Sequence, residues 1–287
     1  MAVYKRTYQG YEGRLTPGWS RFLIITRYAY ERVFDSKFLL TFLVSCLVWP
    51  AICAAIIYFP HNSGAMALLH PSARNLIPIN GNFFLRFMAW QGSLAFLLTA
   101  FVSPGLISSD LRNNALPLYF CRPFSRAEYV LGKMAVLVIL LSAITWIPGL
   151  LLFGLEAVLE GGVWFWDNRW MAKGIFLGSW IWILVLSLLG LALSAWVRWK
   201  LAAAALLFAV FFVAAGFGQA INNILHTDYG KLINLVELIG TIWAGLFRTT
   251  PVSGLTEFDA WEGLLGICAF CLYLLARKVK AYEVVRS

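Results

Sequence analysis

The chain has 287 residues, of which 61% are hydrophobic and only 13% are charged, and its mean hydropathy is +0.75. A soluble domain carries roughly 25% charged residues, so this composition excludes a soluble enzyme or binding module and indicates an integral membrane protein. The net charge is +9. We do not expect nucleic-acid binding, because the basic residues lie near the ends of apolar runs rather than on a soluble patch.

Residues 1–37 form a basic, aromatic leader. Thr16-Pro17 predicts an N-cap followed by proline at the first helical position, and Arg27 and Glu31 lie at pairing distance on the polar face. The opposite, apolar face comprises Phe22, Ile25, Ala29 and Val33. We expect this amphipathic helix to lie along the cytoplasmic membrane surface, the alternative being that it packs on its own protein. No cleavable signal peptide is expected, because the leader is too long for a typical n-region.

Six apolar runs are long enough to cross a ~30 Å hydrocarbon core, which takes about 20 helical residues. They cover residues 38–59, 87–107, 134–155, 174–197, 201–221 and 261–276. The last run is short, but Arg277 and Lys278 can extend it by snorkelling. The expected fold is therefore all-α: a single transmembrane domain over residues 1–287, with six spans and an N-terminal amphipathic interfacial helix.

The distribution of basic residues orients these spans. With six spans, both termini lie on the same side of the membrane. The opposite side would keep only six of the 23 lysines and arginines, namely Arg74, Arg86, Arg169, Lys173, Lys231 and Arg248. The positive-inside rule therefore predicts that both termini and the polar segment 110–133 are cytoplasmic, with the chain in the plasma (inner) membrane.

Segment 110–133, DLRNNALPLYFCRPFSRAEYVLGK, connects the second and third spans. Ser125-Arg126-Ala127-Glu128 has the spacing of a capping box, so a helix is predicted to begin at Ser125 and to run into the third span. Pro123 separates that helix from what precedes it. We expect residues 110–116 to form a short helix that Pro117 ends. Such an elbow, tied to two spans, would transmit a push from the cytoplasm.

This segment resembles the permease subunits of type-2 ABC transporters. The resemblance rests on an acidic residue and Arg112 after the second span, on Leu116, and on the run Arg122-Pro123-x-Ser125-Arg126-x-x-Tyr129-x-x-Gly132-Lys133. It implies a cytoplasmic coupling helix that docks into a groove on a separate ATPase subunit. The residues expected to make this contact are Asp110, Arg112, Leu116, Pro123 and Arg126. The chain departs from many members at Asn113-Asn114, where they have glycine and a small hydroxyl residue.

The resemblance also implies that the motor is another protein. No G-x-x-x-x-G-K-[ST] phosphate loop occurs in the sequence, and the cytoplasmic segments are too short to form a nucleotide-binding domain. We therefore expect a non-catalytic subunit without a cofactor of its own, with ATP bound by the partner. Six spans are half of the number that a complete transporter of this family usually has. The resemblance therefore implies two permease subunits, identical or different, and two ATPase subunits.

The external side carries weaker signals. Residues 231–247 are apolar around Glu237, and we expect a short helix or helix pair dipping into the outer leaflet rather than a seventh span. Gly174-x-x-x-Gly178 would permit close helix contact, as at a subunit interface. The segment 163–170, VWFWDNRW, is typical of an aromatic interface belt. No metal site is expected, because the three histidines are widely separated in external loops: His61, His70 and His226.

Polar residues inside the spans are candidates for a substrate path. They are Gln91, Ser93, Ser142, Thr145 and Ser187. The default alternative is that hydroxyl groups bond to their own helix backbone. The span centres carry no acidic, basic or histidine residue, which disfavours an ion-coupled carrier and an intramembrane enzyme.

The predicted function is the permease subunit of an ATP-driven transporter that exports a hydrophobic or amphipathic substrate. Two alternatives stay open: an ion-coupled carrier or channel, and a membrane scaffold or assembly factor that moves nothing.

Overall fold

The computed structural model describes residues 20–61, 78–120, 125–226, 228–250 and 254–278, and this part of the chain consists of helices joined by turns, with no strand. Six helical stretches in it are long and apolar enough to cross a membrane. They are Lys37–His61, Gly81–Arg112, Arg126–Glu160, Gly162–Trp196, Lys200–Ile224 and Glu257–Lys278. The all-α fold and the six predicted spans are confirmed, although most of the helices extend past the apolar runs that predicted them.

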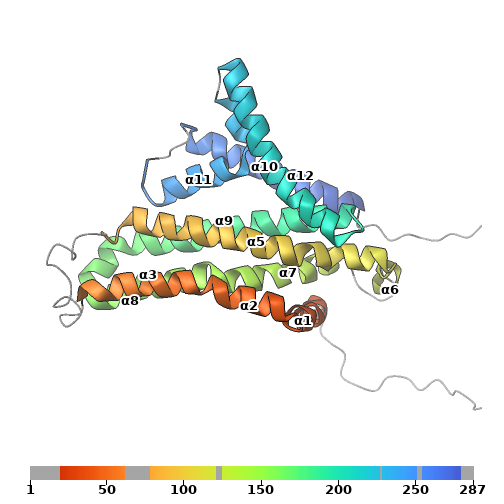
Figure 1. Ribbon diagram of the computed structural model, residues 1–287, viewed down its shortest axis with the longest axis horizontal. Helices are drawn as coiled ribbons and strands as arrows, with labels where there is room; N and C mark the ends of the chain where they lie inside the picture. Colours follow the sequence, from red (N-terminus) through yellow and green to blue (C-terminus); the bar gives the residue numbers. More distant parts are fainter. Residues whose placement is uncertain (1–19, 62–77, 121–124, 227, 251–253, 279–287) are drawn as a thin grey trace, which may run out of the picture.

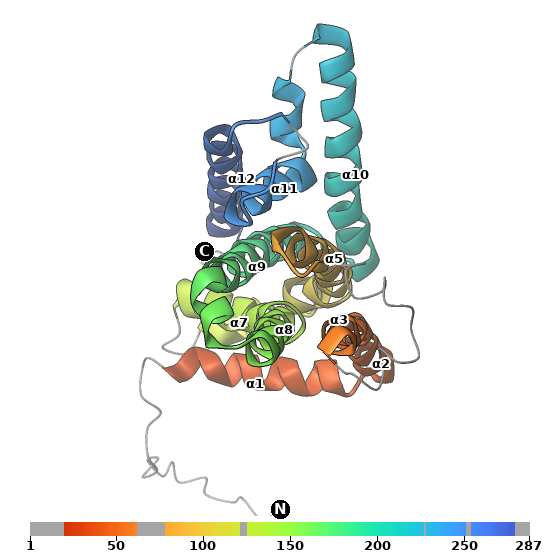
Figure 2. The same ribbon diagram turned by 90° about the vertical axis from the view of Figure 1, so that its left-hand side faces the viewer.

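Three of these stretches form the centre of the molecule. They are α5 (Gly81–Arg112), the pair α7 (Arg126–Ile144) and α8 (Trp146–Glu160), and α9 (Gly162–Trp196), which lie side by side (Figures 1 and 2). In the most apolar 18 residues of each of these three stretches, 61%, 61% and 67% of the residues are buried. In each of the other three stretches the corresponding share is 22%. The outer spans therefore leave most of their apolar surface for lipid or for another protein.

The first span is broken in the middle, into α2 (Lys37–Cys46) and α3 (Val48–Tyr58). Pro50 has no N–H to donate to the carbonyl of Cys46, four residues earlier. The Gln91 side chain of α5 supplies the missing donor, with Nε2 lying 3.0 Å from the Cys46 oxygen. Gln91, predicted as a substrate-path residue, is thus buried and satisfies the backbone of a broken helix.

The second and third spans also contain proline. Pro104 lies inside α5, which stays helical there, and the Ser194 hydroxyl of α9 bonds to the turn that follows it: the hydroxyl oxygen accepts the N–H groups of Ile107 and Ser108 at 3.2 and 3.0 Å. In the third span, Pro148 follows a break between α7 and α8 at Thr145. The Thr145 hydroxyl donates to the Leu141 carbonyl at 2.7 Å. Hydroxyl groups therefore bond to the helix backbone near both prolines.

The C-terminal part projects away from the bundle. α10 (Lys200–Leu225) rises from it, and η4 (Tyr229–Ile233), α11 (Leu235–Leu246) and α12 (Glu257–Lys278) return to it (Figures 1 and 2). α11 has 12 residues, too few to span a bilayer, so the prediction that 231–247 is not a seventh span is confirmed. The close contact that Gly174 and Gly178 were expected to permit is made inside the chain and not at a subunit interface. Both glycines are buried, Gly174 against Phe247 and Gly178 against Trp243, at the C-terminal end of α11.

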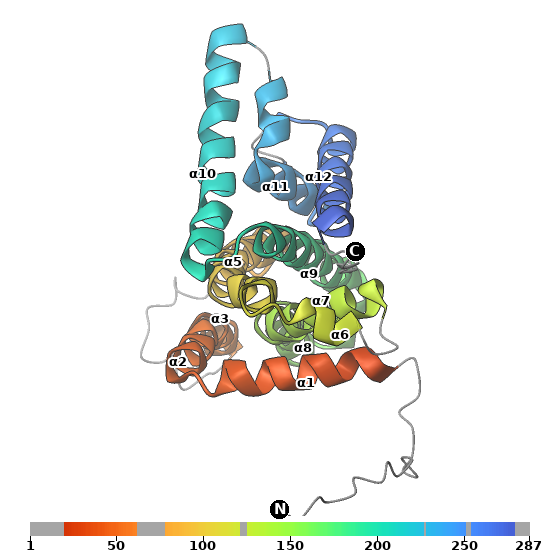
Figure 3. The ribbon, with the colours of Figure 1, turned by 90° about the vertical axis from the view of Figure 1, so that its right-hand side faces the viewer.

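The leader helix α1 (Arg21–Phe34) runs across one end of the bundle, roughly perpendicular to the central helices (Figures 2 and 3). The predicted pairing of Arg27 with Glu31 is confirmed, at 3.4 Å, whereas Thr16-Pro17 lies outside the described residues. Ile25 and Val33 are buried in the core, as the packing alternative requires. Other apolar side chains of α1 stay exposed, namely Leu23, Ile24, Tyr28 and Phe34.

Candidate functional site

The elbow between α5 and α7 differs from its prediction at the first helix. α5 continues to Arg112, and the short helix α6 is Leu116–Phe120, with Pro117 in its first turn, where proline is tolerated. A helix over 110–116 is therefore wrong. The turn between α5 and α6 is a Schellman motif: the Ala115 N–H donates to the Asp110 carbonyl at 2.8 Å.

Asn114 is the residue that makes this motif possible. It takes a φ of 50°, in the left-handed region that usually favours glycine and that asparagine tolerates better than most residues. The asparagine pair, a departure from the pattern of type-2 permeases, thus provides the conformation that glycine would have provided. The chain turns sharply after α5 without a glycine.

The capping box at the start of α7 is confirmed. The Ser125 hydroxyl accepts the Glu128 N–H at 3.2 Å, and the Glu128 carboxylate accepts the Ser125 N–H at 2.6 Å. Two of the backbone donors that a helix start leaves unpaired are thereby satisfied. The start of α7 is fixed locally, because both partners lie within one turn.

A buried group of three polar side chains joins the ends of α5 and α7. Asp110 Oδ2 accepts a hydrogen bond from the Tyr129 hydroxyl and pairs with Lys133 Nζ, each at 2.8 Å. Asp110 is 7% exposed, Lys133 5% and Tyr129 not at all. A buried ion pair with an extra hydrogen bond is strongly destabilised when one partner is lost, because the other charge stays behind unpaired. We call Asp110, Tyr129 and Lys133 the elbow lock.

α1 packs against α7 at the same level. The Thr26 hydroxyl donates to the Gly132 carbonyl at 2.9 Å. A Cβ atom on Gly132 would lie 2.8 Å from the Phe22 carbonyl oxygen, so only glycine permits this approach. The turn of α7 that carries Lys133 is therefore held by α5 on one side and by α1 on another (Figure 3).

The residues predicted to contact an ATPase divide into two groups. Arg112 and Arg126 are exposed and Leu116 is half-buried, so they lie at the surface of the elbow. Asp110 is buried in the elbow lock and has no surface to offer a partner. Pro123 lies outside the described residues. Sequence reasoning missed the roles of Tyr129 and Lys133, although their spacing of four residues places both on one helix face.

The residues predicted to line a substrate path do not come together. Ser142 and Ser187 are buried, and Ser187 Oγ has no hydrogen-bond partner among the described residues. Gln91 and Thr145 satisfy the backbone, as described above. Of the five residues, Ser93 alone lines the groove between α5, α10 and α11, and its hydroxyl donates to the Ala89 carbonyl of its own helix at 3.0 Å. For Ser93 and Thr145 the default alternative of a bond to the helix backbone describes the structure.

The groove that contains Ser93 lies between α5, α10 and α11 and has a volume of about 730 Å³. Aromatic side chains form much of its wall: Phe96, Trp182, Phe208, Phe211, Phe212 and Trp243. Polar groups come from residues on and beside α11: Asn234, Glu237, Thr241 and Thr250. An apolar wall with a few polar groups on one side is typical of a site for an amphipathic molecule.

No protein-family model matches the chain, and no curated protein matches it significantly. The function is therefore argued from the residues and from their arrangement.

Proposed function

We propose that the chain is the permease subunit of an ATP-driven transporter of the type-2 ABC class, and that residues 110–126 receive the push of a separate ATPase subunit. The observation that carries the proposal is the elbow lock. It ties the ends of two central spans together directly behind an exposed surface formed by Arg112, Arg126 and α6. A force applied to that surface acts on both spans at once.

The same end of the molecule collects the other segments that we place in the cytoplasm. The turn between α9 and α10 and the last turn of α12 lie there with α1 and α6 (Figure 1). Lys278 sits 5.2 Å from the centre of the Trp196 ring, which connects the two. Both termini are then cytoplasmic, and α1, running across the spans with apolar side chains exposed, lies at the inner membrane surface.

In this proposal, α5 transmits the movement that ATP causes at the elbow to the groove. Pro104, which cannot donate a backbone hydrogen bond, lies inside α5 between the elbow and the groove, and the Ser194 hydroxyl of α9 donates to its carbonyl. Tilting the elbow bends α5 at this point and changes the width of the groove, which holds the cargo. The groove favours a hydrophobic or amphipathic cargo, which is exported when a second permease subunit completes the path. To switch populations cleanly, the ATPase must favour one state by several kcal/mol.

The test is charge reversal at the exposed elbow. Arg112→Glu and Arg126→Glu should each weaken docking of the ATPase at least about tenfold, because a like-charge contact costs several kcal/mol. The measurements are transport and cargo-stimulated ATP hydrolysis of the complex purified in mild detergent. Arg198→Glu, an exposed arginine in the turn between α9 and α10, is the matched control and should leave both unchanged.

Three results would contradict the proposal. Wild-type transport in both elbow variants would remove the docking role. Transport in liposomes by this chain alone would identify an ion-coupled carrier or channel. Stable partner binding without any transport would identify a scaffold or assembly factor.

A further inference from the structure

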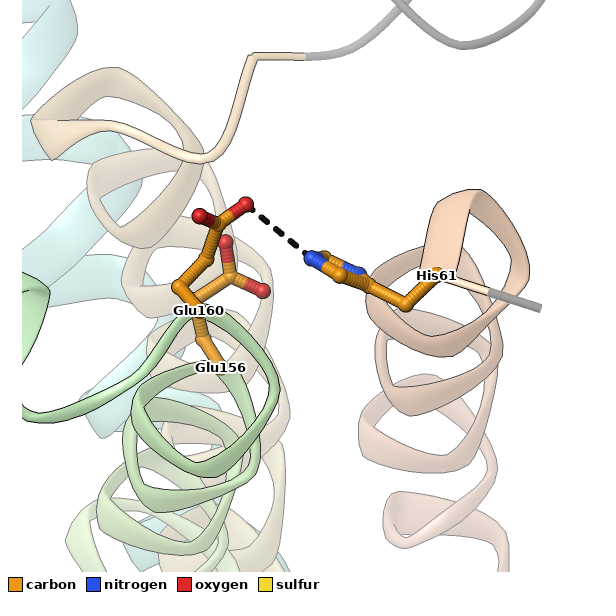
Figure 4. A group of neighbouring side chains, drawn as sticks. All are labelled: His61, Glu156 and Glu160. Atoms are coloured by element: carbon orange, nitrogen blue, oxygen red, sulfur yellow. Dashed lines mark hydrogen bonds and ion pairs between the residues drawn. The ribbon is translucent and has the colours of Figure 1, made fainter. Parts of the chain in front are cut away.

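A second polar cluster lies at the opposite end of the bundle from the elbow. His61 ends η2 (Phe59–His61), directly after α3, while Glu156 and Glu160 occupy successive turns of α8 (Figures 1 and 4). Both carboxylates face the imidazole ring, and the ligand atoms of the three residues all lie within 4.8 Å of one another. His61 was expected in a solvated loop, far from the other histidines. The structure places it instead against two glutamates about a hundred residues away in the sequence.

The contacts of His61 leave a place for a cation. Nδ1 lies 3.1 Å from the Ile57 carbonyl oxygen, which can only accept, so Nδ1 carries the hydrogen. Nε2 of the neutral ring then carries no hydrogen and can only accept, yet it lies 3.0 Å from Glu160 Oε1, which also accepts. Two acceptors at this distance require a positive charge that both of them share: a proton on Nε2 or a metal ion.

Glu156 favours the metal ion. Its side chain is 3% exposed, and its Oε2 atom has no hydrogen-bond partner among the described residues. A proton on His61 would be shared with Glu160 and would leave this buried oxygen unsatisfied, which costs free energy. A metal ion held by all three side chains satisfies His61, Glu156 and Glu160 together.

The distances suit a small divalent ion. Ligands that lie 2.0–2.2 Å from Zn²⁺ in tetrahedral geometry are about 3.4 Å from each other, so His61 Nε2 and Glu160 Oε1, 3.0 Å apart, need to separate only slightly to hold the ion. Glu160 is about half exposed, so its carboxylate can adjust. The bond from Nδ1–H to a backbone carbonyl is the usual outer-shell support of a metal-binding histidine, and it leaves Nε2 free as the ligand.

We propose that His61, Glu156 and Glu160 form a site for a divalent transition-metal ion of the Zn²⁺ type. One imidazole nitrogen and two carboxylate oxygens are the protein ligands, and water completes the coordination. The bound ion connects the outer ends of the first and third spans, whose helices α3 and α8 also pack against each other. It stabilises the arrangement in which these two helices touch.

The experiment uses the full chain, purified without a polyhistidine tag, with ZnCl₂ as the probe. Calorimetry should show one Zn²⁺ per chain, and the Tm should rise with Zn²⁺ concentration because the ion binds the folded state. His61→Ala, Glu156→Gln and Glu160→Gln should each weaken binding at least about tenfold, since loss of even an outer-shell partner typically costs 10- to 100-fold. His226→Ala, which removes an exposed histidine elsewhere, should bind Zn²⁺ like the wild type.

Co²⁺ provides a second measurement on the wild type and does not depend on how the variants fold. Its visible spectrum should show nitrogen and oxygen ligands without the charge-transfer band of a thiolate, which excludes binding by the cysteines. Failure of the wild type to bind Zn²⁺ would overturn the proposal and leave a protonated ion pair. Equal Zn²⁺ affinity of His61→Ala and the wild type, or a thiolate band with Co²⁺, would overturn it as well.

Discussion

Asp110 illustrates how one charged side chain can join two membrane helices. It lies at the end of α5, yet Lys133 and Tyr129 from α7 surround its carboxylate, and all three side chains are buried. Paired charges at the end of a span let both helices continue beyond the apolar run, because neither charge has to reach water. Asp110 was expected to contact an ATPase; in the structure its carboxylate holds the elbow together.

The elbow lock makes a prediction about stability. Asp110→Leu leaves Lys133 buried without a partner and should cost about 3–5 kcal/mol, and Lys133→Met should cost a similar amount. The double variant should recover most of this loss, because an apolar pair of similar volume replaces the ion pair. The measurement is the Tm of the purified protein and its two single and one double variants.

The control for this cycle is the exposed pair of Arg27 and Glu31. Glu31→Gln should leave the Tm unchanged, because exposed helix pairs contribute little. Additive losses in the elbow double variant, or a drop in Tm for Glu31→Gln as large as for Asp110→Leu, would contradict the account.

At the scale of single residues, the sequence predicted contacts between neighbours in the chain better than contacts between distant residues. It predicted the capping box at Ser125 correctly, since both partners lie within four residues. It could not connect Gln91 with Cys46, or His61 with Glu160, because the pairs are 45 and 99 residues apart. Nothing in a local pattern specifies which distant backbone a buried amide will satisfy.

At the scale of elements, the existence of the spans was predictable and their ends were not. An apolar run of about 20 residues indicates that a helix is present. It does not indicate where the helix ends, because the helices continue through polar residues beyond the runs. α9, for example, begins at Gly162 and absorbs the aromatic segment 163–170 into one continuous helix. The short helix of the elbow was misplaced because the left-handed conformation of Asn114, which ends α5, has no strong signal in the sequence.

The broken first span makes a prediction about two elements. Gln91→Met removes the donor to the Cys46 carbonyl and should destabilise the protein by about 1–3 kcal/mol, because a buried acceptor loses its partner. In a Pro50→Ala background the restored N–H can bond to that carbonyl, so the same change should cost much less. The measurement is a double-mutant cycle of Tm values; an equal cost of Gln91→Met in both backgrounds would disprove the link.

At the scale of the molecule, the chain is a bundle with different constraints at its two ends. At one end, α1, the elbow lock and the start of α7 are packed together. At the other end, His61 meets Glu160 of α8 (Figure 4). The outer spans, α2–α3, α10 and α12, leave most of their surface uncovered. This uneven burial is consistent with a subunit that functions beside a second copy or a related chain, which we propose.

The central claim is that the elbow docks on a separate ATPase, and site-specific cross-linking tests it most directly. A photo-reactive amino acid at position 118, where Leu118 is 72% exposed on α6, should capture a nucleotide-hydrolysing protein in native membranes. The same group at position 158, where Val158 is 81% exposed near the opposite end, should capture none. Capture of no ATPase at 118, or equal capture at both positions, would contradict the account.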